Sequence, residues 1–446
     1  MHSAILDIPE VAALDARRHL VRIPPQLDVP LTERVRRTID TAAFRRLARI
    51  SQLGLVSLVY PAANHSRFEH SLGVYRLALL YLKRLAYDSR FISAVDVGQA
   101  QVFIAAALLH DLGHWPFCHP IEDMNLPDVP RHETLAESFI CQGELSEVLR
   151  GYWQIDPQQV VALLAQPPRT PAERLLKTML AGPIDIDKMD YLFRDSLHAG
   201  VPYGRNFDQQ RLLGSLCLSS NGQGLAITEK GKTAAELMVF ARYVMFSEVY
   251  WHHAVRAATA MLQRAFYMLY KQMDLSALFR LSEAEMVSAM LAAAADGAAA
   301  ELLVGLFGPR RQLYKRVAQY SLFENGDLYQ QLARRPYHWL ARCAEEFALH
   351  ASAELGQAVA GHELLFDAPP VTREVEFNVE IFYQKENRYR RLGDVSPVIA
   401  TLAREQFDDY VKRVRIFAHP RVAADLRRLP ELDRLVERAV ASTGEA

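Results

Sequence analysis

The sequence has few of the features that mark secreted or membrane proteins. Its four cysteines among 446 residues are widely spaced and form no Cys-x-x-Cys pair, which argues against a disulfide framework and predicts reduced thiols. Its longest apolar runs, such as VFIAAALL at 102–109, are too short to cross a bilayer. The N-terminal segment has early acidic residues and no long apolar stretch, so we expect no signal peptide, no membrane partner and a cytoplasmic protein.

The chain also lacks an excess of charge of either sign. The formal net charge is -1, so nucleic acid is not expected as the main partner, and any anion-binding surface must be local. Half of the residues are hydrophobic, which is typical of a globular protein. The chain is long enough for a large core and for two domains.

Apolar residues recur at helical spacing through most of the first 270 residues. Leucines and aromatics at three- and four-residue steps predict a helix at 74–87. The nearly all-apolar stretch 98–112 predicts a second helix at the centre of a bundle. Further helices are expected at 171–180, at 234–270 as one helix or two in series, and at 282–306 with a break at Asp-Gly.

The pattern changes after about residue 365. Rough apolar and polar alternation in VTREVEFNVEIFYQ (371–384) and the stretch YVKRVRIFAHP (410–420) predict strands. We therefore expect a mainly α protein, with a helical core at 1–275 and a smaller α+β region at 276–446. The second region is expected to brace the core and to form subunit contacts.

Histidines are concentrated in one part of the chain. Six of the fifteen histidines fall between residues 65 and 132. A lone histidine is most often a satisfied polar group at a helix end, but packing alone does not explain such a cluster. If HDLGH (110–114) were helical, His110 and His114 would share one face, with Asp111 beside them.

Imidazole and carboxylate groups together suit a divalent transition ion, Mg²⁺ or Mn²⁺ better than a structural zinc. The cysteines are expected to play no part in metal binding, because Cys118 has no partner at ligand spacing. The stretch IDIDKMDY (184–191) offers additional carboxylates. The sequence therefore predicts an oxygen-rich metal site.

Five short motifs follow one another along the chain: HSRFEHSLGV (65–74), HDLGH (110–114), FCHPIE (117–122), RHE (131–133) and IDIDKMDY (184–191). Their order resembles that seen in the HD-domain phosphohydrolases. More narrowly, they resemble those of the deoxynucleoside triphosphate triphosphohydrolases, which include bacterial dGTPase-like enzymes and the vertebrate antiviral dNTPase. The resemblance extends over about residues 35 to 270 and implies an HD-domain helical bundle.

The resemblance implies which residues hold a metal ion. One divalent ion per site is expected, and its identity among Mg, Mn, Fe, Zn, Ni and Co is open. Two imidazoles and two carboxylates would leave positions on the ion for a phosphate oxygen and water. The implied ligands are His70, His110, Asp111 and Asp187.

The resemblance also implies the reaction and a catalytic group. The family hydrolyses a dNTP at the α-phosphorus and releases the deoxynucleoside and intact triphosphate. His132, oriented by Glu122, is expected to protonate the leaving group or neutralise the phosphate, and His114 and His119 to contact phosphate, water or sugar. Glu122 departs from the family pattern, which commonly has Asp at this position.

Substrate-binding residues follow from the same resemblance. Arginines and a lysine would bind phosphate, an amide and a carboxylate would bind the 3′-hydroxyl, and a tyrosine would exclude a ribose 2′-hydroxyl by clash. Taken singly, the aromatics fit core packing and the cations fit a solvated surface. The implied residues are Gln52, Leu53, Arg67, Lys188, Tyr191, Asp195, Arg242, Tyr250 and His252.

Two other functions remain open at this point. One is an HD phosphohydrolase that acts on a different nucleotide or phosphoester. The other is a nucleotide sensor that has kept the fold and lost turnover. The resemblance further implies a homo-oligomer, either a dimer or a tetramer.

Overall fold

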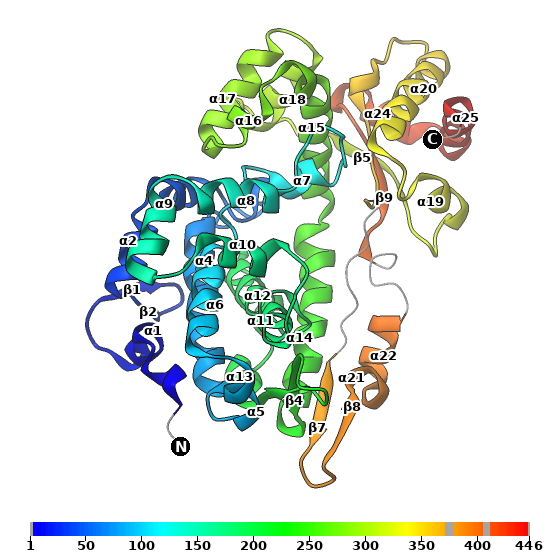
Figure 1. Ribbon diagram of the computed structural model, residues 1–446. Helices are drawn as coiled ribbons and strands as arrows, with labels where there is room; N and C mark the ends of the chain where they lie inside the picture. The colour runs from blue at the N-terminus through cyan, green and yellow to red at the C-terminus, as the bar shows by residue number, and fades with distance from the viewer. Residues whose placement is uncertain (1–2, 371–378, 405–410, 445–446) are drawn as a thin grey trace.

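The computed structural model describes residues 3–370, 379–404 and 411–444. Most of these residues lie in helices, with small sheets between them (Figure 1). The mainly α fold is confirmed, as is the smaller α+β region toward the C-terminus. Within these ranges, no helix is both long enough and apolar enough to cross a membrane.

The centre of the N-terminal body is formed by helices α4 (Arg67–Leu85), α6 (Val97–Leu109) and α12 (Ile186–Ala199). Helix α6 begins with a capping box between Asp96 and Gln99, and all its residues from Val102 to its end are buried. Burial on every side explains why its sequence is almost entirely apolar rather than amphipathic. The central helix expected at 98–112 is therefore present as far as Leu109.

Shorter elements surround these three helices (Figure 1). The helices expected at 74–87 and 171–180 are confirmed as parts of α4 and α11. The shorter elements are α1 (Pro9–Ala12), β1 (Leu20–Ile23), β2 (Leu27–Pro30), α2 (Glu33–Ile39), α3 (Ala42–Arg45), α5 (Ser89–Ala94), α7 (Cys118–Glu122), α8 (His132–Cys141), α9 (Gly143–Val148), α10 (Pro157–Ala165), α11 (Pro171–Ala181), α13 (Gln209–Ser215), β3 (Leu216–Leu218) and β4 (Leu225–Thr228).

The long helical pattern at 234–270 forms two helices in series. Helix α14 (Lys232–Met245) continues into a π-helical turn at Phe246–Tyr250, and α15 (His253–Leu269) follows. The ring of His252 caps α15, because its Nδ1 accepts a hydrogen bond from the amide of Ala254 at 3.3 Å. The π turn means that residues before and after it do not share one continuous α-helical face.

The C-terminal region packs against α15. Helices α17 and α18 are separated at Asp296 and Gly297, which confirms the break expected there. Strands β5, β9 and β6 form an antiparallel sheet with β9 in the middle, which confirms the strand expected near 410–420. The elements are α16 (Leu275–Leu278), α17 (Glu283–Ala294), α18 (Ala298–Phe307), β5 (Lys315–Tyr320), α19 (Gly326–Leu332), α20 (Tyr337–Leu355), β6 (Leu364–Asp367), β9 (Val414–Ala418), α24 (Pro420–Arg428) and α25 (Leu432–Thr443).

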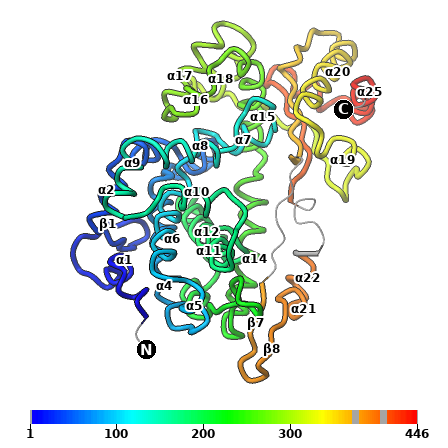
Figure 2. Tube along the Cα trace, viewed as in Figure 1, coloured from blue at the N-terminus to red at the C-terminus, as the bar shows by residue number. Residues whose placement is uncertain are grey.

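One late segment returns to the N-terminal body. Strand β7 (Glu380–Tyr383) pairs in parallel with β4 and antiparallel with β8 (Arg388–Arg391), beside helices α21 (Leu392–Val395) and α22 (Pro397–Arg404) (Figure 2). The strand expected at 371–384 is thus present at its end, whereas 371–378 lie outside the described residues. The division of the chain at residue 275 stays a prediction, and the pairing of β4 with β7 crosses it.

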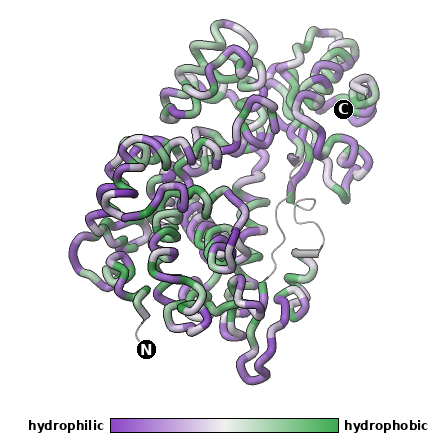
Figure 3. The backbone as a smooth tube through the Cα atoms, viewed as in Figure 1, coloured by the Kyte–Doolittle hydropathy of each residue, from purple (hydrophilic) through white to green (hydrophobic). Residues whose placement is uncertain are grey.

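The hydrophobic residues form separate clusters, and the turn after α6 joins two of them. The first cluster lies among α4, α6, α12 and α14, and the second contains Trp115 and Phe117 together with residues of α15 to α18. Hydrophobic and hydrophilic residues alternate along many of the surrounding helices, as expected for helices with one buried side (Figure 3). The histidine-rich residues therefore lie between two cores.

Candidate metal centre and active site

The chain leaves helical geometry where the HDLGH motif begins. Helix α6 ends at Leu109, and His110 is its C-terminal cap. The amide of Leu112 then donates to the carbonyl of Leu109, and the amide of His114 to that of Asp111, both at 3.0 Å. These are tight turns rather than an α-helix, so the expectation of a helix to residue 112, with two histidines on one face, was wrong.

A glycine in this turn brings a second helix close. A Cβ atom at Gly113 would overlap the carbonyl oxygen of His132 and lie 2.7 Å from the amide nitrogen of Ala136. Only glycine therefore lets the first turn of α8 lie against the HDLGH turn. The approach places the ring of His132 with its centroid 4.0 Å from that of His114.

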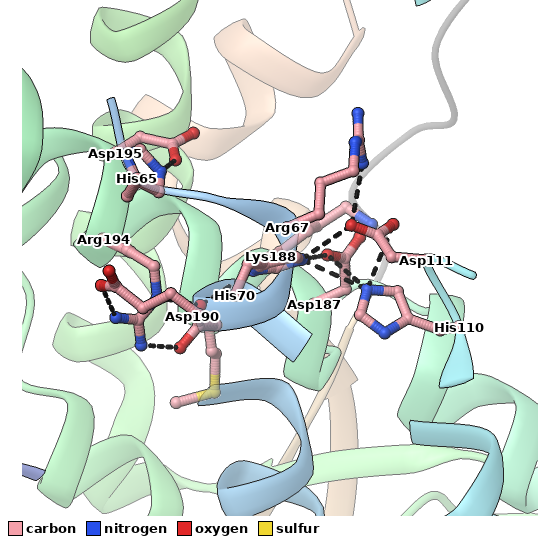
Figure 4. Close-up of polar contacts among 12 residues, drawn as sticks. His65, Arg67, His70, His110, Asp111, Asp187, Lys188, Asp190, Arg194 and Asp195 are labelled. Carbon is pink, nitrogen blue, oxygen red and sulfur yellow. Dashed lines mark hydrogen bonds and ion pairs between the residues drawn. The ribbon is translucent and has the colours of Figure 1, made fainter. Parts of the chain in front are cut away.

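The four predicted metal ligands come together from α4, the HDLGH turn and α12 (Figure 4). The Nε2 atom of His70 lies 3.0 Å from Oδ1 of Asp187 and 3.2 Å from Nε2 of His110. His110 Nε2 lies 3.5 Å from Asp111 Oδ1 and 3.8 Å from Asp187 Oδ1. His70 Nε2 and Asp111 Oδ2 are 4.0 Å apart.

One ligand atom each from His70, His110 and Asp187 lies within 4.8 Å of the other two, which fits a single divalent ion, and Asp111 lies beside His110 at the edge of this group. Atoms bound to one ion at about 2.1 Å lie about 3 Å apart when they occupy neighbouring positions. The charges agree with the distances. Burial lowers the pKa of His70, but the hydrogen bonds that Asp187 and Asp190 accept from its ring outweigh burial and raise this pKa to about 10. A site that holds a proton this strongly is one that attracts a cation.

The second nitrogen of His70 is fixed by a buried ion pair. Nδ1 of His70 lies 2.8 Å from Oδ2 of Asp190, and the guanidinium of Arg194 contacts both carboxylate oxygens of Asp190 at 2.7 and 2.8 Å (Figure 4). Burial raises the pKa of Asp190, but Arg194 outweighs it and holds the pKa well below its usual range. An ionised Asp190 keeps Nδ1 protonated and leaves Nε2 to face the metal centre.

The predicted acid–base group lies beside the metal centre. The Nδ1 atom of His132 is 3.0 Å from Oε2 of Glu122, which also accepts the backbone amide of His132 through Oε1 at 2.8 Å. Burial lowers the pKa of His132, but the hydrogen bond and charge of Glu122 outweigh it and raise this pKa. The side chain of His119 is 63% exposed, with its ring centroid 5.0 Å from that of His114.

His114 joins this group to the metal centre. Its Nδ1 atom lies 3.2 Å from Oδ1 of Asp111. Burial and the nearby Arg67 lower the pKa of His114 well below its usual value. Arg67 is itself held by Asp111, with Nη1 donating to Oδ2 at 2.8 Å (Figure 4).

A cavity of about 500 Å³ opens beside these groups. The amide oxygen Oε1 of Gln52 is buried in its wall and has no hydrogen-bond partner among the described residues. Asp195 accepts the hydroxyl of Tyr250 at 2.6 Å and contacts Nε2 of His65 at 2.9 Å. The predicted site residues that line the cavity are Gln52, Leu53, Arg67, His119, Glu122, Tyr191, Asp195 and Tyr250.

Three predicted phosphate or nucleotide contacts lie outside this wall. The ammonium of Lys188 lies 2.6 Å from Oδ2 of Asp185. The Cζ atom of Arg242 lies 5.6 Å from the centroid of the Phe246 ring. Burial raises the pKa of Tyr191, and the positive charge of Arg242 opposes this rise. The ring of His252 packs edge-on to Tyr60 while it caps α15. Their substrate-binding roles stay predictions.

Comparison with models of protein families shows to which family the chain belongs. The model of the HD domain matches residues 67–191, a span that contains all four metal-ligand candidates. The model of the HD-associated region matches residues 207–430, about half of the chain. The chain belongs to the HD-domain phosphohydrolases.

This HD-domain protein is similar to two proteins of known sequence and to one protein of known crystal structure. An uncharacterized protein from Methanocaldococcus jannaschii, MJ1154, is 30% identical over 84% of this chain and 74% of its own length. Deoxynucleoside triphosphate triphosphohydrolase SAMHD1 from Gallus gallus is 31% identical, over 52% of this chain and 42% of its own length. A crystal structure of a hypothetical protein from Aquifex aeolicus has a TM-score of 0.71 and 27% identity, covering 92% of this chain and 98% of its own.

The HD-domain site contains residues that the sequence argument did not assign. Asp190 and Arg194 are four residues apart on α12, a spacing typical of helical ion pairs that would have revealed their contact. Arg131 and Lys412 line the cavity together with Asp123. Nothing in the local sequence indicates that residue 412 lies near residue 123, because the contact depends on the packing of β9 against the catalytic body.

Gly73 provides a test of the pair that orients His70. A Cβ atom at Gly73 would overlap both the carboxylate of Asp190 and the guanidinium of Arg194. We expect Gly73→Ala to displace Asp190 from His70 and to weaken Mn²⁺ binding about 10- to 100-fold, as measured by isothermal titration calorimetry. Gly214→Ala is the control, since nothing lies within 4 Å of a Cβ there. Unchanged Mn²⁺ affinity in Gly73→Ala would show that the pair does not position His70.

Proposed function

We propose that this HD-domain protein hydrolyses deoxynucleoside triphosphates to deoxynucleoside and inorganic triphosphate. The observation that carries the proposal is the amide oxygen of Gln52, which has no hydrogen-bond partner among the described residues and lies in one cavity with Asp195, Tyr191 and Arg67. A buried polar atom without a partner points to a ligand that supplies one. A sugar with hydroxyl donors, next to a cation that binds phosphate, meets that need.

The sugar end of the cavity fits a deoxyribose. Asp195 already accepts hydrogen bonds on both oxygens and retains lone pairs for the 3′-hydroxyl. The ring of Tyr191 lies with its centroid 6.5 Å from that of Tyr250, so the two aromatics form one wall. In this proposal Tyr191 lies beneath C2′ and excludes a ribose by clash.

The phosphate end fits hydrolysis at the α-phosphorus. When bound, a divalent ion at the four ligands would supply positive charge beside the phosphate oxygens. Arg67, oriented by Asp111, would bind phosphate through the donors that Asp111 leaves free. His132, in its protonated form, would donate a proton to the departing 5′-oxygen, while the oxygen of water forms the new bond to phosphorus.

The test is a product analysis. Purified protein is incubated with each dNTP and with each ribonucleoside triphosphate, in Mg²⁺ and in Mn²⁺, and products are resolved by ion-exchange chromatography. We expect deoxynucleoside and triphosphate, with at least tenfold slower turnover of the ribonucleotides.

Monophosphate with pyrophosphate would overturn the proposal in favour of another HD phosphohydrolase. Binding of dNTP without turnover in either metal would favour a sensor. Turnover only in a mixture of dNTPs would retain the reaction and add an activating nucleotide.

A further inference from the structure

Cys118 lies close to His114, four residues before it in the sequence, and to His132, which belongs to the separate helix α8. One ligand atom from each of His114, Cys118 and His132 can be chosen so that all three lie within 4.8 Å of one another. His114 and Cys118 are buried, and His132 is half-buried. The sequence expectation that Cys118 has no partner at ligand spacing is therefore wrong, because Gly113 admits α8 and brings His132 to this point.

A thiolate and two imidazoles form a soft ligand set. Zn²⁺ binds sulfur at about 2.3 Å and nitrogen at about 2.0 Å, so tetrahedral neighbours lie about 3.5 Å apart, a spacing inside the 4.8 Å that encloses the three ligand atoms. Mg²⁺ and Mn²⁺ prefer oxygen ligands and are not expected here. The set is thus chemically distinct from the oxygen-rich centre at His70.

The hydrogen bond of His132 supports the same interpretation. Nδ1 of His132 lies 3.0 Å from Glu122, whereas Nδ1 of His114, 3.2 Å from Asp111, makes no hydrogen bond within the described residues. Histidines that bind zinc almost always present one nitrogen to a carboxylate or carbonyl and the other to the metal. Cys118 and Glu122 also line the cavity, so water can approach a fourth position.

We propose that His114, Cys118 and His132 form a second cation site, which binds a soft divalent ion such as Zn²⁺ and thereby blocks turnover. Binding breaks the S–H bond of Cys118 and an N–H bond of the protonated His132, forms one sulfur–metal and two nitrogen–metal bonds, and releases both protons to solvent. Burial raises the pKa of the Cys118 thiol, so it remains protonated until a soft cation arrives. The inhibition of turnover rests on the proposed function, because it removes His132 as the proton donor of that reaction. The binding of the cation does not rest on the proposed function.

The binding test uses Cd²⁺ and the full-length chain preloaded with Mg²⁺. Cadmium bound to a thiolate gives an ultraviolet charge-transfer band, which the oxygen-rich centre cannot produce. We expect the band in the native protein and in Asp187→Asn, which weakens only the first centre. We expect it to disappear in Cys118→Ala and to persist in Cys343→Ala, where another buried thiol is removed. A band that persists in Cys118→Ala, or no band in the native protein, would overturn the site.

The activity test compares each protein with itself. One equivalent of Zn²⁺ should lower dNTP hydrolysis at least tenfold in the native protein and in Cys343→Ala, and a chelator should restore it. In Cys118→Ala the ratio of rates with and without Zn²⁺ should remain near one. Equal inhibition of both variants would overturn the block. If no dNTP is hydrolysed, the proposed function fails, while the charge-transfer band still decides whether the cation site exists.

Discussion

Asp111→Asn is expected to lower dNTP hydrolysis about 10³-fold and to remove the tightly bound metal ion. The carboxylate contacts the metal centre, Arg67 and His114 at once, with oxygens 2.8 Å from Arg67 Nη1 and 3.2 Å from His114 Nδ1. Burial raises the pKa of Asp111, but His114 and Arg67 outweigh it and hold this pKa well below its usual range. Asn keeps the shape but loses the negative charge that a cation needs. A loss of about 4 kcal/mol of transition-state stabilisation corresponds to this factor.

Two measurements distinguish this effect from misfolding. Metal content by mass spectrometry should fall in Asp111→Asn and remain native in Asp128→Asn, an exposed aspartate in the loop before α8. Circular dichroism should show the same helical content in both variants. Full activity in Asp111→Asn, or loss of activity with native metal content and native substrate affinity, would mean that Asp111 does not hold the ion.

Much of the fold was predictable because local pattern and burial agree. Helices α4, α11, α17 and α18 follow from apolar spacing and from the break at Asp296 and Gly297. The grouping of His70, His110, Asp111 and Asp187 followed from the order of the motifs rather than from any helical face. Local spacing failed at the HDLGH turn itself, since the helix ends at Leu109 where the chain turns toward the second core.

The features that escaped prediction depend on contacts between distant segments. Arg194 and Asp190 fit around Gly73, so a residue of α4 decides where a pair on α12 can lie. The return of β7 to β4 pairs residues 380 and 226, which no local pattern indicates. Cys118 acquires its histidine partners only because a glycine lets α8 approach. In each case a small side chain or an edge strand, rather than a polar motif, determines which groups meet.

His132→Asn is expected to lower kcat about 10²- to 10⁴-fold with little change in metal binding at the His70 centre. His132 is the group placed to donate a proton to the leaving 5′-oxygen, and a positioned acid contributes about this factor. Asn can keep a hydrogen bond to Glu122 through its amide but cannot supply the proton. Native activity in His132→Asn would exclude His132 as the acid.

The pH dependence separates the acid from a merely structural histidine. Burial lowers the pKa of His132, and Glu122, 3.0 Å from Nδ1, raises it further than burial lowers it. The active form is protonated, so activity is present below this pKa and is lost as pH rises through it. Glu122→Gln removes the charge that raises the pKa, and the alkaline limb of kcat should therefore move to lower pH. Glu137 is exposed on α8, the helix that begins with His132, so Glu137→Gln should leave the alkaline limb in place. An alkaline limb that stays fixed in Glu122→Gln would mean that a group other than His132 sets it.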